Sequence, residues 1–443
     1  MILRPYQVQM IDSARQAATR HRRLCMVLPT GGGKSALLGH IASSAASRGR
    51  RVLAVVHRRR LVQQLTATME AWGCADAVPV RSVQSIRTPT MDPPDLLLVD
   101  EAHHLIAGNQ WGRLIEAWPD ARLIGFTATP SRLDGVGLGE GHGGYFQQLV
   151  IGPDARWLTD QGFLAPARVF SWPGPSLAGI RTRMGDLDLQ QAEQAMAGLM
   201  GDAVTEYQRH LAGRTAIANC CSVAHAESVA AAFRAEGIPA AALTGTVSRQ
   251  EQDRLFADLA DGTLQVLAQC EIVSEGVDIP AVAGALMLRP TQSTVVWLQQ
   301  LGRALRPAPG KAAAIILDHA GNARRPGLGL PTDPREWTLE GRKRRKGDPV
   351  PPVRSCPTCF CCVPASVSEC PECGHAWKAQ VRELKRLEGT LSEMAQEAIR
   401  WHRVREERAC LTLEEWEALG RARGYAPGWG RIRYAARLRR VRV

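Results

Sequence analysis

The sequence lacks any long apolar run. None of its 443 residues lies in an uninterrupted apolar stretch near the roughly 18–20 residues that a membrane-spanning helix needs. The first residues, MILRPYQVQM, also lack the basic region followed by an apolar region that marks a secretory signal. We therefore expect a cytoplasmic protein that makes no membrane contact. Because the chain is too long for one compact core, we expect two or three domains.

Acidic residues are missing from residues 421–443, which hold eight arginines. A second basic run, RKRRK, occupies residues 342–346. The net charge of the chain is +12, and these two segments alone carry +13, so the remaining residues are close to neutral. Such clusters favour a polyanionic partner such as nucleic acid. A solvated tail that only aids solubility is the alternative.

Short apolar runs alternate with helical patterns through most of the chain. Segments 59–72, 224–236 and 249–259 carry apolar residues at three- and four-residue spacing, which predicts amphipathic helices. Six runs indicate buried parallel strands: RVLAVVH (51–57), DLLLVD (95–100), RLIGFTA (122–128), TAIANCC (215–221), TLQVLAQC (263–270) and AAAIILD (312–318). This alternation predicts an α/β fold with helices on both faces of parallel sheets.

The alternating pattern falls into two blocks. We expect α/β lobes at 1–165 and 205–325, joined by a linker at 166–204 that contains the Pro/Gly-rich stretch SWPGPSLAG. Beyond them we expect a basic, Pro-rich linker at 326–352, a cysteine-rich module at 353–378 and a helical, basic region at 379–443. Two such lobes side by side form a cleft between their strand ends, where ligands of parallel sheets usually bind.

The stretch LPTGGGKS at residues 28–35 indicates a phosphate-binding loop. Its glycines let backbone N–H groups converge on phosphate oxygens, and the next helix adds its positive N-terminal end. Lys34 would reach the β- and γ-phosphates of ATP, and Ser35 would ligate Mg²⁺. The strict pattern has glycine where this chain has Leu28, and a tight strand–helix turn is the alternative reading. The residues expected to bind the nucleotide here are Pro29, Thr30, Gly31, Gly32, Gly33, Lys34 and Ser35.

Two carboxylates end the apolar run DLLLV. Asp100 can hold Mg²⁺ through water, and Glu101 can polarise the water that attacks the γ-phosphate. Acidic residues end strands in many α/β proteins, but their pairing with GGGKS upstream favours the catalytic interpretation.

Together these motifs resemble those of superfamily 2 helicases and translocases of the DEAD/DEAH-box kind. The motifs follow in order: RPYQ (4–7) looks like the adenine-reading motif, PTGGGKS like motif I, VVHRRRLVQQ (55–64) like motif Ia, RSVQSI (81–86) like the next strand-binding motif, DEAH (100–103) like motif II, TATP (127–130) like motif III, SEGVDIP (274–280) like motif V and QQLGRALRP (299–307) like motif VI. The resemblance implies two RecA-like lobes that hydrolyse ATP with Mg²⁺. Within this family Leu28 is an acceptable variant, and Tyr6 and Gln7 are expected to contact the adenine.

Motif VI also has a physical reading of its own. Gln299, Arg303 and Arg306 recur at three- or four-residue spacing and therefore share one helix face. Arginines from the second lobe can cross the cleft and stabilise the charge that spreads over the γ-phosphate in the transition state. The resemblance further implies that Gly276 and Asp278 of motif V face ATP. A basic helix face in water is the alternative.

A cleft that closes on ATP can do work if each lobe grips a nucleic-acid backbone. Such grips would contact phosphates and carry no sequence information. Motif matches suggest Arg58, Arg59, Gln84, Thr129 and Thr244 as contacts, although Arg58 and Arg59 can equally be solvated charges at a helix start.

Six of the twelve cysteines lie within residues 356–373. Two C-P-x-C knuckles, Cys356/Cys359 and Cys370/Cys373, have the spacing of a zinc ribbon that holds Zn²⁺ by four thiolates. Cys361 and Cys362 compete for the first pair, which we prefer because it repeats the second knuckle. We interpret the ribbon as a structural metal site in a module that binds nucleic acid or a protein partner. The alternative is a metal site that only stabilises the fold.

The tail 422–443 interleaves Tyr425, Trp429 and Tyr434 with arginines, a mixture able to stack on bases and contact phosphates. Packing aromatics of a small helical cap explain it equally well. The layout of LRPYQ, DEAH and a C-terminal cysteine ribbon looks most like bacterial and phage helicases related to XPB and RadD. We therefore expect an ATP-dependent DNA helicase or translocase acting in DNA repair or replication, with DNA favoured over RNA and with protein partners for the ribbon or tail. The alternatives are an RNA helicase, a motor subunit of a restriction-type complex that does not unwind, and a binding module that ATP merely switches.

Overall fold

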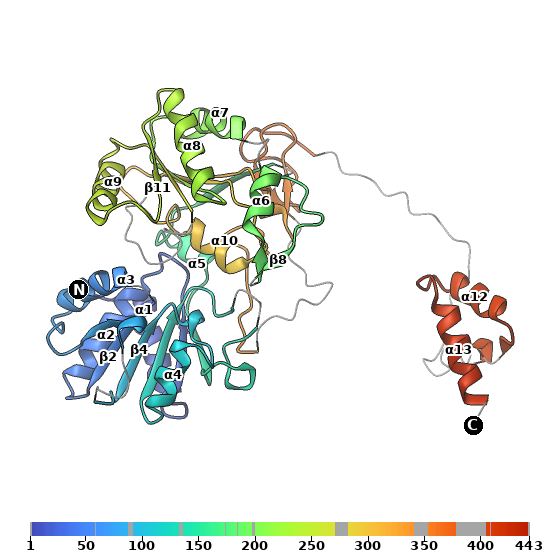
Figure 1. Ribbon diagram of the computed structural model, residues 1–443, viewed down its shortest axis with the longest axis horizontal. Coiled ribbons are helices and arrows are strands. Elements are labelled where there is room, and N and C mark those ends of the chain that lie inside the picture. The colour runs from blue at the N-terminus through green and yellow to red at the C-terminus, as the bar shows by residue number, and fades with distance from the viewer. Residues whose placement is uncertain are drawn as a thin grey trace. The chain divides into compact units, whose positions relative to one another are not determined.

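The computed structural model describes residues 2–57, 59–86, 92–132, 136–172, 174–183, 185–196, 200–270, 282–340, 353–377, 405–407 and 409–441. The chain forms two compact units, residues 1–378 and 379–443, and each is described by itself (Figure 1). The first unit holds two parallel sheets of six strands each and a small cysteine-rich module. Within the described part of the chain, no helix is long and apolar enough to cross a membrane.

The first lobe is built on a parallel sheet with the strand order β3-β2-β4-β5-β1-β6. The strands span Arg23–Val27 (β1), Val52–Val56 (β2), Val80–Ser82 (β3), Leu96–Asp100 (β4), Arg122–Thr127 (β5) and Gln148–Ile151 (β6). Side chains of α1 (Pro5–Ala17), α2 (Lys34–Ala46) and α3 (Arg59–Ala71) share one buried cluster with one face of the sheet, whereas α4 (Gln110–Ala117) packs in the cluster on the other face. Helices therefore cover both faces, as the uniformly apolar strands predict.

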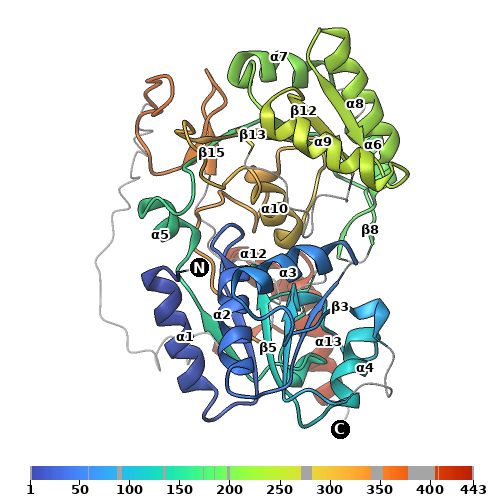
Figure 2. The same cartoon turned by 90° about the vertical axis from the view of Figure 1, so that its left-hand side faces the viewer.

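The second lobe repeats this plan with the order β11-β12-β10-β13-β14-β7 (Figure 2). The strands span Ala167–Ser171 (β7), Ala216–Asn219 (β10), Ala240–Leu243 (β11), Val266–Gln269 (β12), Gly284–Met287 (β13) and Ala314–Asp318 (β14). Helices α9 (Arg249–Asp261) and α10 (Thr294–Leu301) pack on one face, and α7 (Met200–Leu211) and α8 (Val223–Ala235) pack on the other. The α/β prediction and all six expected strands are confirmed.

Both segments expected as linkers contain more structure than their composition indicates. Residues 166–204 begin with β7, which pairs in parallel with β14 and so extends the second sheet. They continue with the short strands β8 (Thr182–Arg183) and β9 (Asp186–Leu187) and the helix α6 (Leu189–Met196). In the second expected linker, residue Leu339 accepts a hydrogen bond from Gly139 N at 2.9 Å, which ties the start of that segment to the first lobe.

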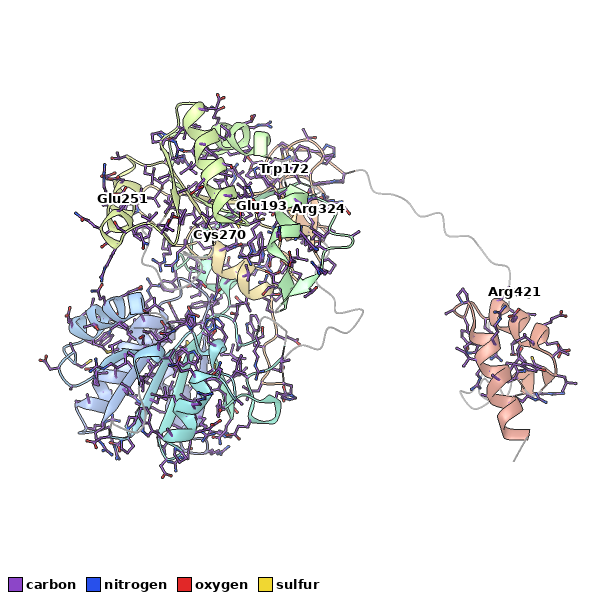
Figure 3. All side chains as sticks on the ribbon, viewed as in Figure 1. Trp172, Glu193, Glu251, Cys270, Arg324 and Arg421 are labelled. Atoms are coloured by element: carbon purple, nitrogen blue, oxygen red, sulfur yellow. The ribbon has the colours of Figure 1, made fainter. Side chains whose placement is uncertain are left out.

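The cysteine-rich module is docked on the edge of the second sheet. Its strands β15 (Val353–Ser355) and β16 (Cys362–Pro364) pair antiparallel. Ser171 N at the end of β7 donates to Phe360 O at 3.0 Å, and Ser355 Oγ donates to Ser171 O at 2.8 Å. The ring of Trp172, labelled in Figure 3, stacks on Phe360 with 5.5 Å between centroids. The module is thus part of the second lobe's edge.

The C-terminal unit is a helical hairpin of α12 (Leu413–Ala422) and α13 (Trp429–Val441). Thr412 and Glu415 form a capping box that starts α12. Buried Trp416 packs against Trp429, whose ring lies 4.7 Å from that of Tyr425. Two of the three aromatic residues of the tail therefore pack within this unit, as the helical-cap interpretation expects.

Candidate active site and metal centre

The glycine-rich loop lies between β1 and α2. Gly31 and Gly33 have φ angles of 83° and 85°, a left-handed conformation that side chains with a Cβ rarely adopt. Gly33 is the residue that caps α2, and the helix begins at Lys34. The N–H groups of the loop and the positive end of the α2 helix dipole therefore lie together at the N-terminus of α2. Such an arrangement favours the binding of an anion.

Leu28 replaces a glycine of the strict pattern because it belongs to the core. Its side chain is 0% exposed, and its N–H donates to Thr127 O at 3.1 Å. A Cβ at Gly32 would lie 2.7 Å from the Leu28 Cγ, so the loop folds directly over this side chain. Leu28 thus supports the loop from below.

Helix α1 supports the loop from a second side. Tyr6 donates its hydroxyl to Gly32 O at 2.7 Å, and Gln7 Nε2 donates to Gly33 O at 3.2 Å. The other end of the same amide, Gln7 Oε1, accepts from Arg4 N at 2.8 Å. Gln7 is only 3% exposed, so in this structure both ends of the side chain that was expected to read adenine are engaged within the chain.

Asp100 and Glu101 face the loop from the end of β4. Burial, followed by the negative charge of Glu101, raises the pKa of Asp100 to about 6, while the nearby ammonium of Lys34 acts in the opposite direction. Glu101 has a φ of 49°, which is strained for a residue other than glycine and is typical of functional sites. Its buried Oε2 atom accepts no hydrogen bond from the described residues, although the ring of His103 lies 3.4 Å away.

His103 of the DEAH motif joins three motifs. Its Nδ1 atom lies 3.1 Å from Thr127 Oγ1 and 3.4 Å from Glu101 Oε2. On the other side of the ring, Nε2 lies 3.5 Å from Gln299 Nε2, which belongs to α10 of the second lobe. His103 is 5% exposed and Gln299 is 7% exposed, so this contact between the lobes is shielded from water.

Motif VI lies directly against the glycine-rich loop. A Cβ at Gly302 would lie 2.2 Å from Thr30 Cγ2, and a Cβ at Gly31 would lie 3.7 Å from Arg306 Cγ. Arg303, between these two contacts, is 6% exposed. The structure therefore brings Gln299 to the DEAH motif, and Gly302 and Arg306 to the nucleotide loop, which lie about 200 to 270 positions earlier in the chain. Helix α10 ends at Leu301, so Arg303 and Arg306 lie beyond the helix whose face they were expected to share with Gln299.

One residue at this interface was not anticipated from the sequence. Lys311 Nζ donates to Val282 O at 2.6 Å, to Arg306 O at 2.9 Å and to Ala304 O. Burial lowers the pKa of this ammonium to about 8. Lys311 thus fixes the backbone that carries Arg306, and nothing in its sequence neighbourhood, PGKAAAI, indicates this role.

The residues present fit ATP and Mg²⁺. The loop offers N–H groups and Lys34, Ser35 is exposed beside them, and Asp100 ends the neighbouring strand. The buried Glu101 Oε2 without a hydrogen bond is the observation that most favours a water held at this point. Gly276 and Asp278, expected to face ATP, lie outside the described residues.

The five expected nucleic-acid contacts differ in placement. Gln84 is exposed and donates from Nε2 to His57 O at 2.6 Å. Thr129 and Thr244 are buried, at 0% and 4% exposure, and Thr244 Oγ1 lies 2.8 Å from Thr246 Oγ1. In this arrangement the two threonines do not reach the surface. Arg58 lies outside the described residues, as does the side chain of Arg59.

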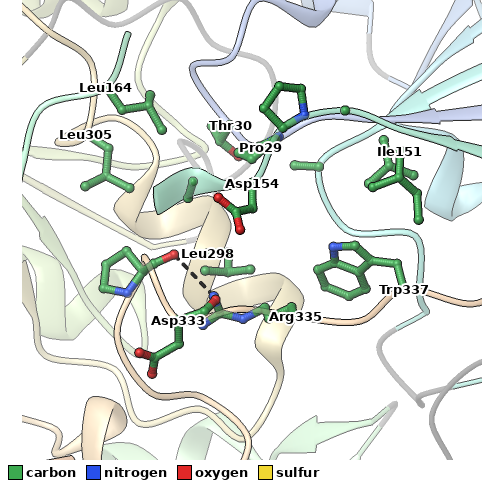
Figure 4. A pocket seen from close by; sticks show the side chains of 16 residues that line it. Pro29, Thr30, Ile151, Asp154, Leu164, Leu298, Leu305, Asp333, Arg335 and Trp337 are labelled. Atoms are coloured by element: carbon green, nitrogen blue, oxygen red, sulfur yellow. Dashed lines mark hydrogen bonds between the residues drawn. The ribbon is translucent and has the colours of Figure 1, made fainter. Parts of the chain in front are cut away.

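A pocket opens beside the loop, between the lobes (Figure 4). Pro29 and Thr30 line it from the first lobe, and Leu298 and Leu305 line it from the second. Its remaining wall includes Asp333, Arg335 and Trp337 from the segment expected to be a linker. Arg335 donates to the carbonyl oxygens of Leu328, Leu330, Pro331 and Asp333, so it holds this segment in one shape.

The four cysteines of the two C-P-x-C knuckles converge. Their Sγ atoms all lie within 4.8 Å of one another, with 3.5 Å between Cys356 and Cys373 and 3.6 Å between Cys359 and Cys370. Tetrahedral Zn²⁺ with Zn–S bonds of about 2.3 Å would place its sulfurs about 3.8 Å apart, so the set fits this metal.

Cys361 and Cys362, the competitors for the first knuckle, are buried at 5% exposure each and pack in the hydrophobic clusters of the second lobe. Neither sulfur belongs to the group of four that lie within 4.8 Å of one another. The cluster therefore selects the pair Cys356/Cys359, as preferred from the sequence.

In the C-terminal unit, several arginines bind the unit's own acids. Arg423 pairs with Glu406 and Glu407 at 2.6 and 3.0 Å, and Arg431 pairs with Glu417 at 2.8 Å. Arg433 also pairs with Glu407. These pairs reduce the charge that the hairpin presents to a polyanion.

Comparisons with known proteins identify relatives across both lobes. A family model described as "Type III restriction enzyme, res subunit" matches residues 1–84 and 76–132, and one described as "Helicase conserved C-terminal domain" matches residues 201–308. A 51.5 kDa protein of a Lactococcus phage is 31% identical over 402 residues, which cover 88% of this chain and 86% of that protein. A protein described as the mitochondrial ATP-dependent helicase irc3 of Schizosaccharomyces pombe is 29% identical; the match covers 76% of this chain but only 60% of irc3.

Solved structures share the fold. A fragment described as an HsdR subunit of a type I restriction enzyme from Vibrio vulnificus matches with a TM-score of 0.57 at 20% identity, covering 75% of this chain and 66% of that one. The type ISP restriction-modification enzyme LlaBIII bound to DNA matches with a TM-score of 0.51 at 15% identity, covering 72% of this chain and 28% of that one.

Proposed function

Because the chain belongs to the superfamily 2 helicases, an ATP-hydrolysing family of nucleic-acid motors, we propose that it moves along or unwinds DNA in DNA repair or replication-related metabolism. In this proposal the domains are a nucleotide-binding lobe at 1–165, a second helicase lobe at 205–325, a zinc ribbon at 353–378 and a basic helical region at 379–443. Residues 166–204 and 326–352 connect them.

The proposed roles follow from where the side chains lie. The loop N–H groups and Lys34 hold the β- and γ-phosphates, while Ser35 and Asp100 hold Mg²⁺, which neutralises phosphate charge when bound. Glu101 orients the attacking water, with His103 fixing its carboxylate. Arg303 and Arg306 stabilise the charge on the γ-phosphate from the second lobe, and Gln299 links that lobe to His103.

One observation carries this proposal: motif VI lies against the nucleotide loop. Gly302 contacts Thr30, Arg306 contacts Gly31, and Gln299 reaches His103. Residues of two lobes thus meet where the γ-phosphate would lie, so hydrolysis would depend on how the lobes are placed. This dependence is what converts a chemical step into motion.

Three observations support DNA as the track. The basic segments 342–346 and 421–443 suit a phosphate backbone. The related fold of LlaBIII is bound to DNA, and the HsdR-like fragment belongs to a type I restriction enzyme. We further propose that Cys356, Cys359, Cys370 and Cys373 hold a structural Zn²⁺, and that protein partners bind through the ribbon or the tail.

The test is ATPase activity against duplex DNA, single-stranded DNA and RNA, with a strand-displacement assay in parallel. We expect stimulation by DNA, and we expect Lys34→Ala and Glu101→Gln to abolish it while DNA binding is retained. Stimulation by RNA alone would contradict the DNA assignment. Full activity of either variant would contradict the proposed chemistry.

A motor that does not unwind is the second candidate, favoured by the restriction-type family match over residues 1–132. It predicts DNA-stimulated hydrolysis that displaces a triplex-forming strand from duplex DNA but does not separate the duplex itself. Duplex separation would reject this candidate.

A further inference from the structure

Four aromatic rings lie in a row within the first lobe. The rings of Trp111 and His57 are nearly parallel, with 6.3 Å between centroids and an angle of 12°. His57 stacks on His104 at 4.2 Å and 13°, and His104 lies 4.3 Å from His103 at 40°. We call Trp111, His57, His104 and His103 the ring stack. The sequence patterns indicate no role for His57 or His104 individually.

One end of the ring stack belongs to the ATP site. His103 lies 3.4 Å from Glu101 Oε2, 3.1 Å from Thr127 Oγ1 and 3.5 Å from Gln299 Nε2. Any change in the position of this ring therefore changes the surroundings of the proposed catalytic carboxylate.

His57 lies next to segments proposed to contact nucleic acid. His57 directly precedes Arg58 and Arg59, and its carbonyl oxygen accepts a hydrogen bond from Gln84 Nε2 at 2.6 Å. Gln84 is exposed, whereas the rings behind it are half-buried or buried. A polyanion that contacts this surface would therefore act on the backbone that carries the His57 ring.

The start of α4 holds His104 and Trp111 in place. Asn109 Nδ2 donates to His104 O at 3.1 Å, and Asn109 Oδ1 caps the helix by accepting from Trp111 N at 2.9 Å. The next residue, Gln110, donates from Nε2 to Val83 O at 3.0 Å, beside Gln84. One helix end thus joins the DEAH strand end, the ring stack and the segment 83–85.

We propose that the ring stack couples nucleic-acid binding at the exposed Gln84, whose side chain bonds to the backbone of His57, to the placement of Glu101. The proposal rests on the proposed function, since it needs a nucleic-acid-stimulated ATPase. Flat rings in contact cannot slide independently without opening a gap, so a displacement of His57 passes to His104 and through one peptide unit to His103. His57 and His104 are positioning residues, because neither reaches the nucleotide.

The test uses His57→Ala, His104→Ala and the double variant in the full chain, with polydeoxythymidine and polyuridine as probes. We expect basal ATPase activity and the affinity for the probe to stay near wild type. Stimulation at a saturating probe concentration should fall by about 5-fold or more, the lower end of typical coupling between sites. The double variant should lose no more than either single variant, because each interrupts the same stack.

Two further variants keep the result interpretable. His104→Phe retains a flat ring and should therefore keep most of the stimulation that His104→Ala loses. If the imidazole were needed for another reason, His104→Phe would lose stimulation as His104→Ala does. His142→Ala removes an exposed histidine outside the stack and should change nothing. If the wild type is stimulated and both alanine variants match it at saturation, the coupling is refuted. If these two probes and duplex DNA all fail to stimulate the wild type, the proposed function itself fails.

Discussion

Replacing Gly302 by alanine tests the contact between the lobes without disturbing the fold. Gly302 follows α10 with φ and ψ of −57° and −25°, an ordinary helical conformation that alanine adopts freely. The three atoms nearest to the new methyl all belong to Thr30 of the nucleotide loop: Cγ2 at 2.2 Å, Cβ at 2.5 Å and Oγ1 at 3.2 Å. The substitution therefore acts on the interface and not on the helix.

The size of the effect follows from these distances. Carbon atoms pack at about 3.5–4.0 Å, so the methyl group would push motif VI away from the loop by about 1.5 Å. A misplacement of about 1 Å can cost about 100-fold in rate, so we expect kcat for ATP hydrolysis to fall by at least that factor. The helix itself should not be destabilised, because its backbone at Gly302 already has a conformation that alanine adopts freely.

The assay compares kcat at saturating ATP and DNA with the melting temperature of the same preparations. Gly141→Ala is the matched control, because a Cβ there meets nothing within 4 Å. A Gly302→Ala variant with wild-type kcat would show that hydrolysis does not need motif VI this close to the loop. A variant that melts early would show that the contact is part of the fold.

Three further predictions concern single residues. Leu28→Gly restores the strict glycine pattern, yet it should destabilise the protein by at least about 3–5 kcal/mol in chemical denaturation because it empties a core site. Cys359→Ser should remove zinc, measured by metal analysis, whereas Cys361→Ser should keep it; equal zinc content in both would contradict the four-sulfur assignment. Burial lowers the pKa of Lys311 to about 8 in the folded chain, so between that value and about 10.4 the unfolded chain binds more protons. The stability of the wild type relative to Lys311→Met should therefore rise from about pH 8 to about pH 10, and a constant difference across this range would refute the burial of a protonated lysine.

The α/β architecture was predictable because it depends on local patterns. Uniformly apolar runs such as DLLLVD and AAAIILD became β4 and β14, each buried on both faces of its sheet. Short strands escaped this reasoning. The four residues of β11 are three alanines and a leucine, and β7 lies at the start of a stretch whose Pro/Gly content resembles a linker. Their pairing partners, not their own composition, make them strands.

The features of the candidate site also differ in whether the sequence could predict them. Phosphate-binding glycines, strand-end carboxylates and paired cysteine knuckles follow from chemistry that acts over a few residues, so the sequence alone located them. The buried state of Thr129 and Thr244 and the engagement of Gln7 by the loop were not predictable, because they depend on neighbours from other segments.

The sequence by itself determined which groups this protein can use: a phosphate loop, an acid pair, the two arginines of motif VI and four thiols. Only the tertiary structure decided which of them meet. It placed Gly302 against Thr30, Lys311 under Arg306, and His57 between the proposed nucleic-acid surface and the DEAH motif. The physical reason is that these contacts join residues far apart in the chain. They form because the two lobes pack closely together, and a local sequence pattern contains no information about that packing.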